Sequence, residues 1–186
     1  MIMENMTFFL YLNIVESNNM NIDELKFAPL NDLNKNYALL TSGNKDSFNT
    51  MTISWGGFGT IWNKPVVTVY VKPIRYTYNF MENNDYFTIS FYDEKYKNDL
   101  LTLGTKSGKD CDKISLTKLS PLYLDNCVSF NEANITIICK KIYYQDLDLD
   151  IIKNNISEDI FNHFYGTDPV HRMYIGEVIK IINGNL

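Results

Sequence analysis

The sequence predicts a mainly β fold with a few short helices, arranged as a barrel or a sandwich. Six short runs are rich in Val, Ile, Thr, Tyr and Phe and are bounded by turn residues, as is typical of strands. Regular alternation of strands with long helices, which a doubly wound sheet requires, is absent. The chain has 186 residues, which suits one domain. At this length about 70% of the surface of the unfolded chain can be buried, so no metal or disulfide is needed for stability.

The strand prediction follows from composition and flanking turns. The polar stretch 42–47, "SGNKDS", separates the first two runs and is predicted to be a turn. The predicted strands cover 36–43, 49–55, 65–71, 86–92, 134–142 and 173–182.

Three short helices are predicted over 76–84, 94–104 and 157–166. The first has Thr77 near its start and ends at paired asparagines. The second has apolar residues at helical spacing and ends at Gly104, and the third runs from Ser157 to Gly166.

The charge balance excludes some function classes and favours one. The formal net charge is −5, from 17 basic and 22 acidic residues, so non-specific binding to nucleic acid is not expected. Between Lys72 and Lys113, however, seven basic residues match seven acidic ones, and a small anion could bind there. Aromatic residues make up 14% of the chain, which fits a β-rich core or a stacking site for a flat ligand.

The N-terminal apolar stretch and the cysteines predict a cytoplasmic protein without a membrane segment. "MTFFLYLNIV" is about ten residues long, too short to span a bilayer, and it lacks the features of a signal peptide. Residues 1–19 are predicted to be an N-terminal extension that could be disordered, and Met20 could be an alternative start. The domain is predicted to cover residues 20–186. The three cysteines fit no zinc pattern and are interpreted as reduced thiols in a cytosolic protein.

Standard metal and nucleotide motifs are not satisfied. His163 and His171 are the only histidines, so a site with several histidine ligands is excluded. The acidic stretch 146–150 is interpreted as a solvated turn in preference to a metal site. In a dinucleotide fingerprint, the third glycine after Gly57-Phe58-Gly59 would fall at Trp62. "LGTKSGKD" lacks the first glycine and the hydroxyl residue of a phosphate loop.

The stretch 52–77, "TISWGGFGTIWNKPVVTVYVKPIRYT", holds the residues for another kind of nucleotide site. Its three glycines predict a turn after Trp55 whose backbone a flat ligand could approach, with Trp55 and Trp62 as walls. Arg75 and Thr77 fall at a predicted helix start, where free N–H groups and the helix dipole favour an anion. This pattern fits a mononucleotide with a large flat ring. The alternative is a tight turn with core tryptophans and a surface arginine.

Four motifs carry a resemblance to a known family. "NTMTISWGGFGTIWNKPVVTVYVKPIRYTYNF" resembles the flavin reductase-like family with the FMN-binding split barrel, in particular its flavoredoxin-like branch. "LGTKSGKDCDK" (103–113), "YYQDLD" (143–148) and "HRMYIGEV" (171–178) follow in the order seen in that branch. The resemblance covers about residues 22–182 and implies a Greek-key split β-barrel, a homodimer, and FMN near the dimer interface.

The resemblance also implies a set of cofactor-binding residues. Arg75 and Thr77 match positions that hold the phosphate, and Ser107 and Lys113 match a stretch that closes over the flavin. Lys72 and Lys109 stand where arginine is expected, which keeps the charge and loses the planar fork. The residues implied to line the flavin ring are Asn49, Thr50, Met51, Thr52, Ser54 and Trp55.

The implied activity is transfer of hydride from NADH or NADPH to the flavin. His171 fits a redox-site histidine near the nicotinamide, although "DPVH" replaces the usual Gly-Asp-His triplet, and the alternative is a structural role at a strand start. The protein is therefore expected to be an NAD(P)H-dependent flavin reductase. The alternative is an FMN-holding electron carrier that serves an electron-acceptor protein and does not use nicotinamide directly.

Overall fold

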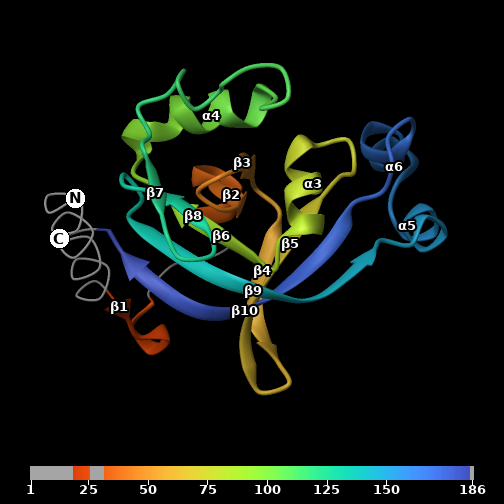
Figure 1. Ribbon diagram of the computed structural model, residues 1–186. Coiled ribbons are helices and arrows are strands. Elements are labelled where there is room, and N and C mark those ends of the chain that lie inside the picture. The colour runs from red at the N-terminus through yellow and green to blue at the C-terminus, as the bar shows by residue number, and fades with distance from the viewer. Residues whose placement is uncertain (1–18, 26–31, 185–186) are drawn as a thin grey trace, which may run out of the picture.

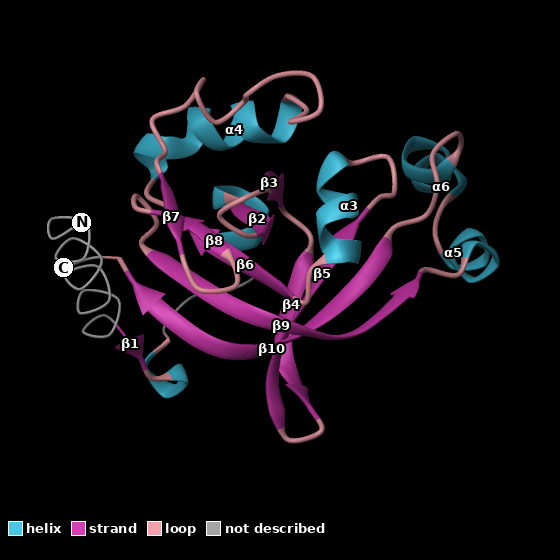
Figure 2. Ribbon diagram, viewed as in Figure 1, coloured by secondary structure: helices cyan, strands magenta, loops and turns pink. Residues whose placement is uncertain are grey.

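The computed structural model describes residues 19–25 and 32–184, and its central feature is one curled antiparallel sheet (Figures 1 and 2). The strands follow one another in the order β3-β2-β6-β9-β10-β5-β4, and β1 pairs with β10. The strands are β1 (Asn19–Met20), β2 (Ala38–Gly43), β3 (Phe48–Ile53), β4 (Gly56–Ile61), β5 (Lys64–Val71), β6 (Tyr86–Phe91), β9 (Ile135–Asp146) and β10 (Arg172–Asn183). A separate hairpin pairs β7 (Pro121–Tyr123) with β8 (Val128–Phe130).

The sheet closes almost into a barrel. Its two outer strands, β3 and β4, are consecutive in the chain and are joined by only Ser54 and Trp55. They are not hydrogen-bonded to each other, so the barrel stays open along this seam. The long strands β9 and β10 curve strongly around the core (Figure 1). Their pairing shifts register at Ile175/Gly176 and at Val178/Lys180, and such bulges bend and twist a strand.

The helices lie outside the barrel. Among the described residues they are η1 (Ile22–Glu24), η2 (Asp32–Asn36), α3 (Tyr76–Asn83), η3 (Glu94–Tyr96), α4 (Lys97–Thr105), α5 (Leu149–Asn155) and α6 (Glu158–Tyr165). Helix α3 contacts β2 and β3, and α4 contacts β3. Helices α5 and α6 form the connection from β9 to β10 at one end of the sheet (Figure 2). None of the helices in the described ranges is both long enough and apolar enough to cross a membrane.

Two buried clusters hold these layers together. The larger one fills the barrel and includes Leu40, Val69, Phe87 and Tyr174, each at most 1% exposed. The second lies beneath α4, where Leu100 and Leu103 pack on Leu39 and Phe130. Burial of these apolar side chains therefore fixes α4 against the outside of the barrel.

The predicted elements are confirmed by the structure. Each of the six strand runs overlaps an observed strand, and the three predicted helices correspond to α3, to η3 with α4, and to α6. The turn predicted over 42–47 joins β2 to β3. The predicted extension 1–19 lies outside the described residues except for Asn19, which begins β1.

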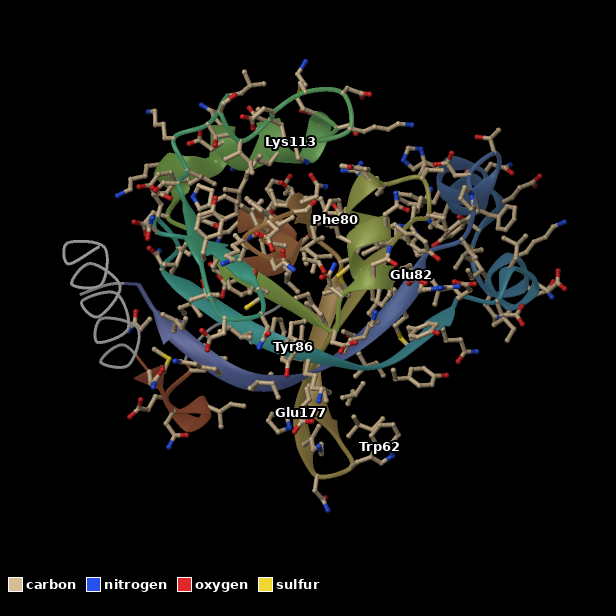
Figure 3. All side chains as sticks on the ribbon, in the orientation of Figure 1. Trp62, Phe80, Glu82, Tyr86, Lys113 and Glu177 are labelled. Carbon is tan, nitrogen blue, oxygen red and sulfur yellow. The ribbon has the colours of Figure 1, made fainter. Side chains whose placement is uncertain are left out.

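The prediction of a glycine-aromatic turn after Trp55 is wrong. Gly56–Ile61 forms β4, which pairs with β5, and the turn falls at Trp62 and Asn63, both with positive φ (51° and 57°). Glycine is needed at position 56 because a Cβ there would lie 2.8 Å from the carbonyl O of Thr68. The hairpin projects from the barrel with Trp62 at its tip, 65% exposed (Figure 3). Neither the three glycines nor Trp62 lines either of the two described cavities, so this segment does not form a ligand-binding turn.

The acidic stretch 146–150 is largely exposed as predicted, but only Leu147 and Asp148 form a connection, between the end of β9 and the start of α5. Asp146 ends β9 and is bound to Arg172, and Asp148 caps α5 by accepting a hydrogen bond from the N–H of Ile151 (2.9 Å). Asp150 lies in the first turn of α5, where a negative charge is favoured by the helix dipole. These carboxylates stabilise a helix start and an ion pair. No group of three metal-ligating side chains occurs within 19–25 and 32–184.

Candidate functional site

Two adjoining cavities form a cleft between the seam of the barrel and the helices outside it. The larger has a volume of about 460 Å³ and the smaller about 260 Å³. The larger is within the range of about 300–1,000 Å³ that is usual for small-molecule sites. They share a wall made by Met51, Ile74, Arg75, Gly104 and Thr105. One extended ligand could therefore occupy both.

The cleft collects most of the residues that the sequence singles out. The larger cavity is lined by Met51, Thr52, Ser54, Trp55, Arg75 and His171, among others. The smaller cavity is lined by Asn49, Met51, Arg75, Thr77, Ser107 and Lys113, among others. These residues come from β3, the seam, the start of α3, the loop after α4 and the residue before β10. The fold therefore brings together segments that are far apart in the sequence.

Thr50 is the predicted site residue that the structure does not bring to the cleft. It is fully buried and lines neither cavity. Its hydroxyl accepts a hydrogen bond from Thr41 Oγ1 (2.9 Å) and donates to the carbonyl O of Leu40 (3.2 Å). Thr50 is therefore enclosed against β2, whereas Thr52, on the same face of β3, lines the larger cavity.

The smaller cavity lies at the N-terminus of α3. Arg75 is the N-cap residue of this helix, and its Nη2 donates to the carbonyl O of Gly104 at 2.7 Å. Thr77 and Asn49 are buried, and Asn49 Nδ2 donates to Thr77 Oγ1 at 2.7 Å. The first turn of α3 holds no acidic residue. Free N–H groups, the helix dipole and the Arg75 charge together favour an anion at this end of the cleft.

Lys113 adds a second cation to the smaller cavity. The side chain is buried, and Nζ donates to the carbonyl oxygens of Leu103 (2.8 Å) and Lys106 (3.2 Å) at the end of α4 (Figure 3). Burial, together with the nearby charge of Arg75, lowers the pKa of Lys113 to about 8. The ammonium group is therefore still charged at pH 7 and is close to losing its proton.

The larger cavity has an aromatic end. Trp55 contacts the rings of Phe164 and His171, with centroid distances of 5.0 Å and 4.8 Å. Lys72 Nζ donates to the carbonyl O of Phe164 (2.6 Å) and to Asp168 (2.7 Å), which fixes the end of α6 beside the cavity. The arrangement presents flat apolar surfaces, which suit a planar ring system.

His171 lies at this aromatic end and is neutral at pH 7. Its Nδ1 is 3.2 Å from the hydroxyl of Tyr165. Burial lowers the pKa of His171 to about 4, and the nearby charge of Lys72 acts in the same direction. The imidazole can therefore exchange hydrogen bonds with a ligand, but it is not a source of protons near neutral pH.

Several residues of the cleft were not predicted from the sequence. Tyr37, Tyr70, Ile74, Phe164 and Asp168 all line the larger cavity. Phe164 and Asp168 are near His171 in the sequence, and the apolar side of the helix 158–165 was the available signal for Phe164. The others depend on how distant segments meet, which periodicity does not report.

The fold and the cleft together define a class of protein: an antiparallel barrel, open at one seam, with a cationic pocket joined to an aromatic one. The flavin reductase like domain matches residues 30–185, and the chain belongs to this family. The family expected from the sequence is thus confirmed. No curated protein matches the chain.

Solved structures show the same fold at low sequence identity. The chain is similar to a flavoredoxin from Methanosarcina acetivorans (TM-score 0.62, 19% identity, covering 79% of this chain and 67% of that one). It is similar to an FMN-binding protein from Thermus thermophilus with bound 1-cyclohex-2-enone (TM-score 0.60, 17% identity, 80% and 70%). A Shewanella frigidimarina protein with a split barrel domain gives a TM-score of 0.62 at 16% identity over 80% and 67%. The predicted mainly β split barrel is confirmed.

Proposed function

We propose that this protein binds FMN in the cleft and acts as an NAD(P)H-dependent flavin reductase. The observation that supports this most strongly is the continuity of the two cavities through Met51, Ile74, Arg75, Gly104 and Thr105. A mononucleotide with a flat ring needs an apolar pocket for the ring beside a cationic pocket for the phosphate. Family membership and the FMN-binding protein from Thermus thermophilus support the same cofactor.

The residues of the cleft fit FMN in charge and shape. Arg75, Lys113 and the N-terminus of α3 would hold the phosphate, with Thr77 and Ser107 at the same pocket. Met51, Thr52, Ser54 and Trp55 would face the ring from the seam. When bound, FMN supplies the two-electron chemistry by taking hydride from the nicotinamide and passing electrons to an acceptor. The protein binds, orients and shields it.

His171 is proposed to contact the nicotinamide co-substrate, NADH or NADPH. Its neutral ring, held beside Trp55 and bonded to Tyr165, offers one hydrogen-bonding nitrogen and a flat face. Hydride transfer needs alignment of two rings and no general acid, so a neutral imidazole is adequate. Its role would be to orient the co-substrate and to exclude water.

The test is an anaerobic mixture of the purified, FMN-loaded protein with NADH or NADPH. Bleaching of the flavin absorbance at about 450 nm, the band of oxidised flavin, is expected within minutes. Unchanged absorbance with both nucleotides, while dithionite still bleaches the flavin, would contradict the reductase. Failure of the protein to bind FMN at all would contradict the cofactor assignment itself.

A second candidate is an FMN-holding electron carrier. Lys72 fixes Phe164 and Asp168 against the aromatic end of the cavity, and the Phe164 and His171 rings already contact Trp55, which narrows the room for a nicotinamide. In this case an electron-transfer protein would reduce the flavin. Bleaching by a reduced partner protein but by neither nucleotide would support the carrier.

The affinity for FMN is expected to fall as pH rises through about 8 because Lys113 loses its charge there. The phosphate is already ionised, since its second pKa is near 6, so only the protein side titrates. Below the Lys113 pKa the ammonium attracts the phosphate, and above it this attraction is lost. Titrations with FMN between pH 7 and 9, about one pH unit on each side of the Lys113 pKa, measure the effect.

The matched pair Lys113→Met and Lys109→Met separates this charge from a general effect. Lys109 belongs to the same loop and stands where an arginine of the anion site is expected, but it is exposed and lines neither cavity. Lys113→Met should flatten the pH profile of the FMN dissociation constant, and Lys109→Met should keep the wild-type slope. An unchanged slope in Lys113→Met would remove Lys113 from the phosphate site.

The protein is also proposed to be a cytoplasmic homodimer, with the β4–β5 hairpin at the contact. Trp62 is 65% exposed and adopts φ 51°, an uncommon conformation for a bulky residue. Contact with a second copy would remove this exposed ring from water. Light scattering of Trp62→Ser should show a shift toward monomer, whereas Tyr123→Ser, which alters another exposed aromatic residue, should not. A monomeric wild type would exclude the dimer.

A further inference from the structure

The far end of α3 is fixed by an ion cluster that the cleft does not include. Glu82, labelled in Figure 3, is near the C-terminal end of this helix. It forms an ion pair with Arg172 at the start of β10. Arg172 Nη1 donates to Glu82 Oε2 at 2.7 Å, and the Tyr174 hydroxyl donates to Glu82 Oε1 at 2.6 Å. Both carboxylate oxygens of Glu82 are therefore held by β10.

Arg172 is itself fixed in place. Its Nε and Nη2 donate to the two carboxylate oxygens of Asp146 at 2.7 Å and 2.9 Å, which is a bidentate pair. The guanidinium lies over the rings of Tyr78 (5.5 Å) and Tyr144 (5.1 Å). The Arg172 side chain is 19% exposed. Isolated surface ion pairs contribute little, but a bidentate pair that belongs to a network is the exception to that rule.

The backbone at the same end of α3 is also held. Lys141 Nζ, from β9, donates to the carbonyl oxygens of Met81 and Glu82. These carbonyls belong to the last turn of α3, where a positive charge is favoured by the helix dipole. Strands β9 and β10 therefore form hydrogen bonds both to the Glu82 side chain and to the backbone at the C-terminal end of α3.

Helix α3 is short, so a change in orientation at one end displaces the other end. The helix has 8 residues, and at about 1.5 Å per residue it is a rod of about 12 Å. Its N-terminal end carries Arg75 and Thr77 at the smaller cavity. If the C-terminal end were released, the helix could tilt. Its N-terminal N–H groups and Arg75 would then no longer be held in one position at the smaller cavity.

We propose that Arg172 is a positioning residue for the phosphate end of the cleft. By holding Glu82, it sets the orientation of α3 and thereby the placement of Arg75 and Thr77. This rests on the proposed function, because it takes the phosphate of FMN as the anion. Arg172 lines neither cavity, so it acts through the helix and not by contact with the ligand.

The test compares FMN with riboflavin, which has the same ring and no phosphate. Arg172→Gln should weaken FMN binding by about 3- to 30-fold, the usual range for residues that act at a distance. Riboflavin binding should change less than about twofold, since the ring pocket is untouched. Hydrogen exchange of the α3 amides should accelerate in the same variant.

Glu177→Gln is the matched control because it breaks another ion pair of β10, that with Lys64 (2.6 Å), away from α3. It should leave the FMN-to-riboflavin ratio and the α3 exchange unchanged. If Arg172→Gln does not fold, Tyr174→Phe removes only one donor to Glu82 and should shift the ratio in the same direction by less. An equal loss for both flavins would show a merely structural role, and an unchanged ratio would also overturn the proposal. A wild type that binds neither flavin would overturn the proposed function together with this inference.

Discussion

Replacing Arg75 with alanine is expected to weaken FMN binding by about 1.5–3 kcal/mol, the size of one hydrogen bond to a charged group. This corresponds to about one to two orders of magnitude in Kd. Arg75 is the cation shared by the two cavities and the N-cap of α3. Its loss removes a charge-assisted contact to the phosphate and leaves Lys113, Lys106 and the helix N-terminus to neutralise it.

The measurement is a titration of the protein with FMN, followed by quenching of the flavin fluorescence. Arg75→Lys keeps the charge but loses the planar fork, so its Kd should lie between wild type and alanine. Lys45→Ala removes one positive charge from the exposed turn between β2 and β3, and its Kd should match wild type. If Arg75→Ala binds FMN with the wild-type Kd, the phosphate does not bind at this end of the cleft.

Arg75 has a second contact that must be separated from binding. Its Nη2 holds the carbonyl O of Gly104, so alanine also loosens the link between α3 and α4. Melting of the FMN-free variant measures this structural part. Riboflavin has no phosphate. If the charge of Arg75 dominates, Arg75→Ala should raise the Kd for riboflavin much less than the Kd for FMN.

The local pattern of the sequence predicted the parts of this site that depend on local rules. Arg75 and Thr77 follow a strand and open a helix, and helix starts attract anions wherever they occur. The β-branched runs likewise reported strands, because each buries side chains on at least one face. These patterns depend only on residues that are close in the sequence, so they can be recognised before the fold is known.

The parts that failed depend on pairing between distant segments. Glycines after Trp55 suggested a ligand-binding turn, yet Gly56 is required by the backbone of β5, and the actual turn carries Trp62 and Asn63, not the usual Asn-Gly. Thr50 shares its strand with Asn49 and Met51 but is bonded to Thr41 and lines neither cavity. Alternation alone could not have identified it, since Met51, Thr52 and Ile53 all line the larger cavity. The pairing of β3 with β2, which encloses Thr50, joins segments that the local pattern does not connect.

The contacts that hold the cleft in place were equally invisible in the sequence. Arg172 and Glu82 are 90 residues apart, and Lys72 and Asp168 are 96 residues apart. Arg172 and Lys72 lie within motifs of the resemblance, but nothing in those motifs identifies Glu82 or Asp168 as their partners. Only the closing of β10 between β5 and β9 brings them together.

Gly176→Val is expected to reduce the free energy of unfolding by about 3 kcal/mol, the upper part of the usual range for overpacking a core. A Cβ at this position would lie 2.4 Å from Phe87 Cζ and 2.7 Å from Cys139 Cβ. Both neighbours are at most 1% exposed, so neither can move into solvent. Gly176 also sits at the register shift of β10, where the strand bends around the barrel.

Urea unfolding of the FMN-free protein measures this, and Gly59→Val is the matched control. Position 59 has no atom within 4 Å of an added Cβ, so the same substitution should change the unfolding free energy by less than about 0.5 kcal/mol. Since a domain is stable by about 5–15 kcal/mol, Gly176→Val should still fold but at a lower midpoint. Equal midpoints for the two variants would mean that the Phe87 ring can yield, and that β10 is not held closely against β6 and β9 at its bend.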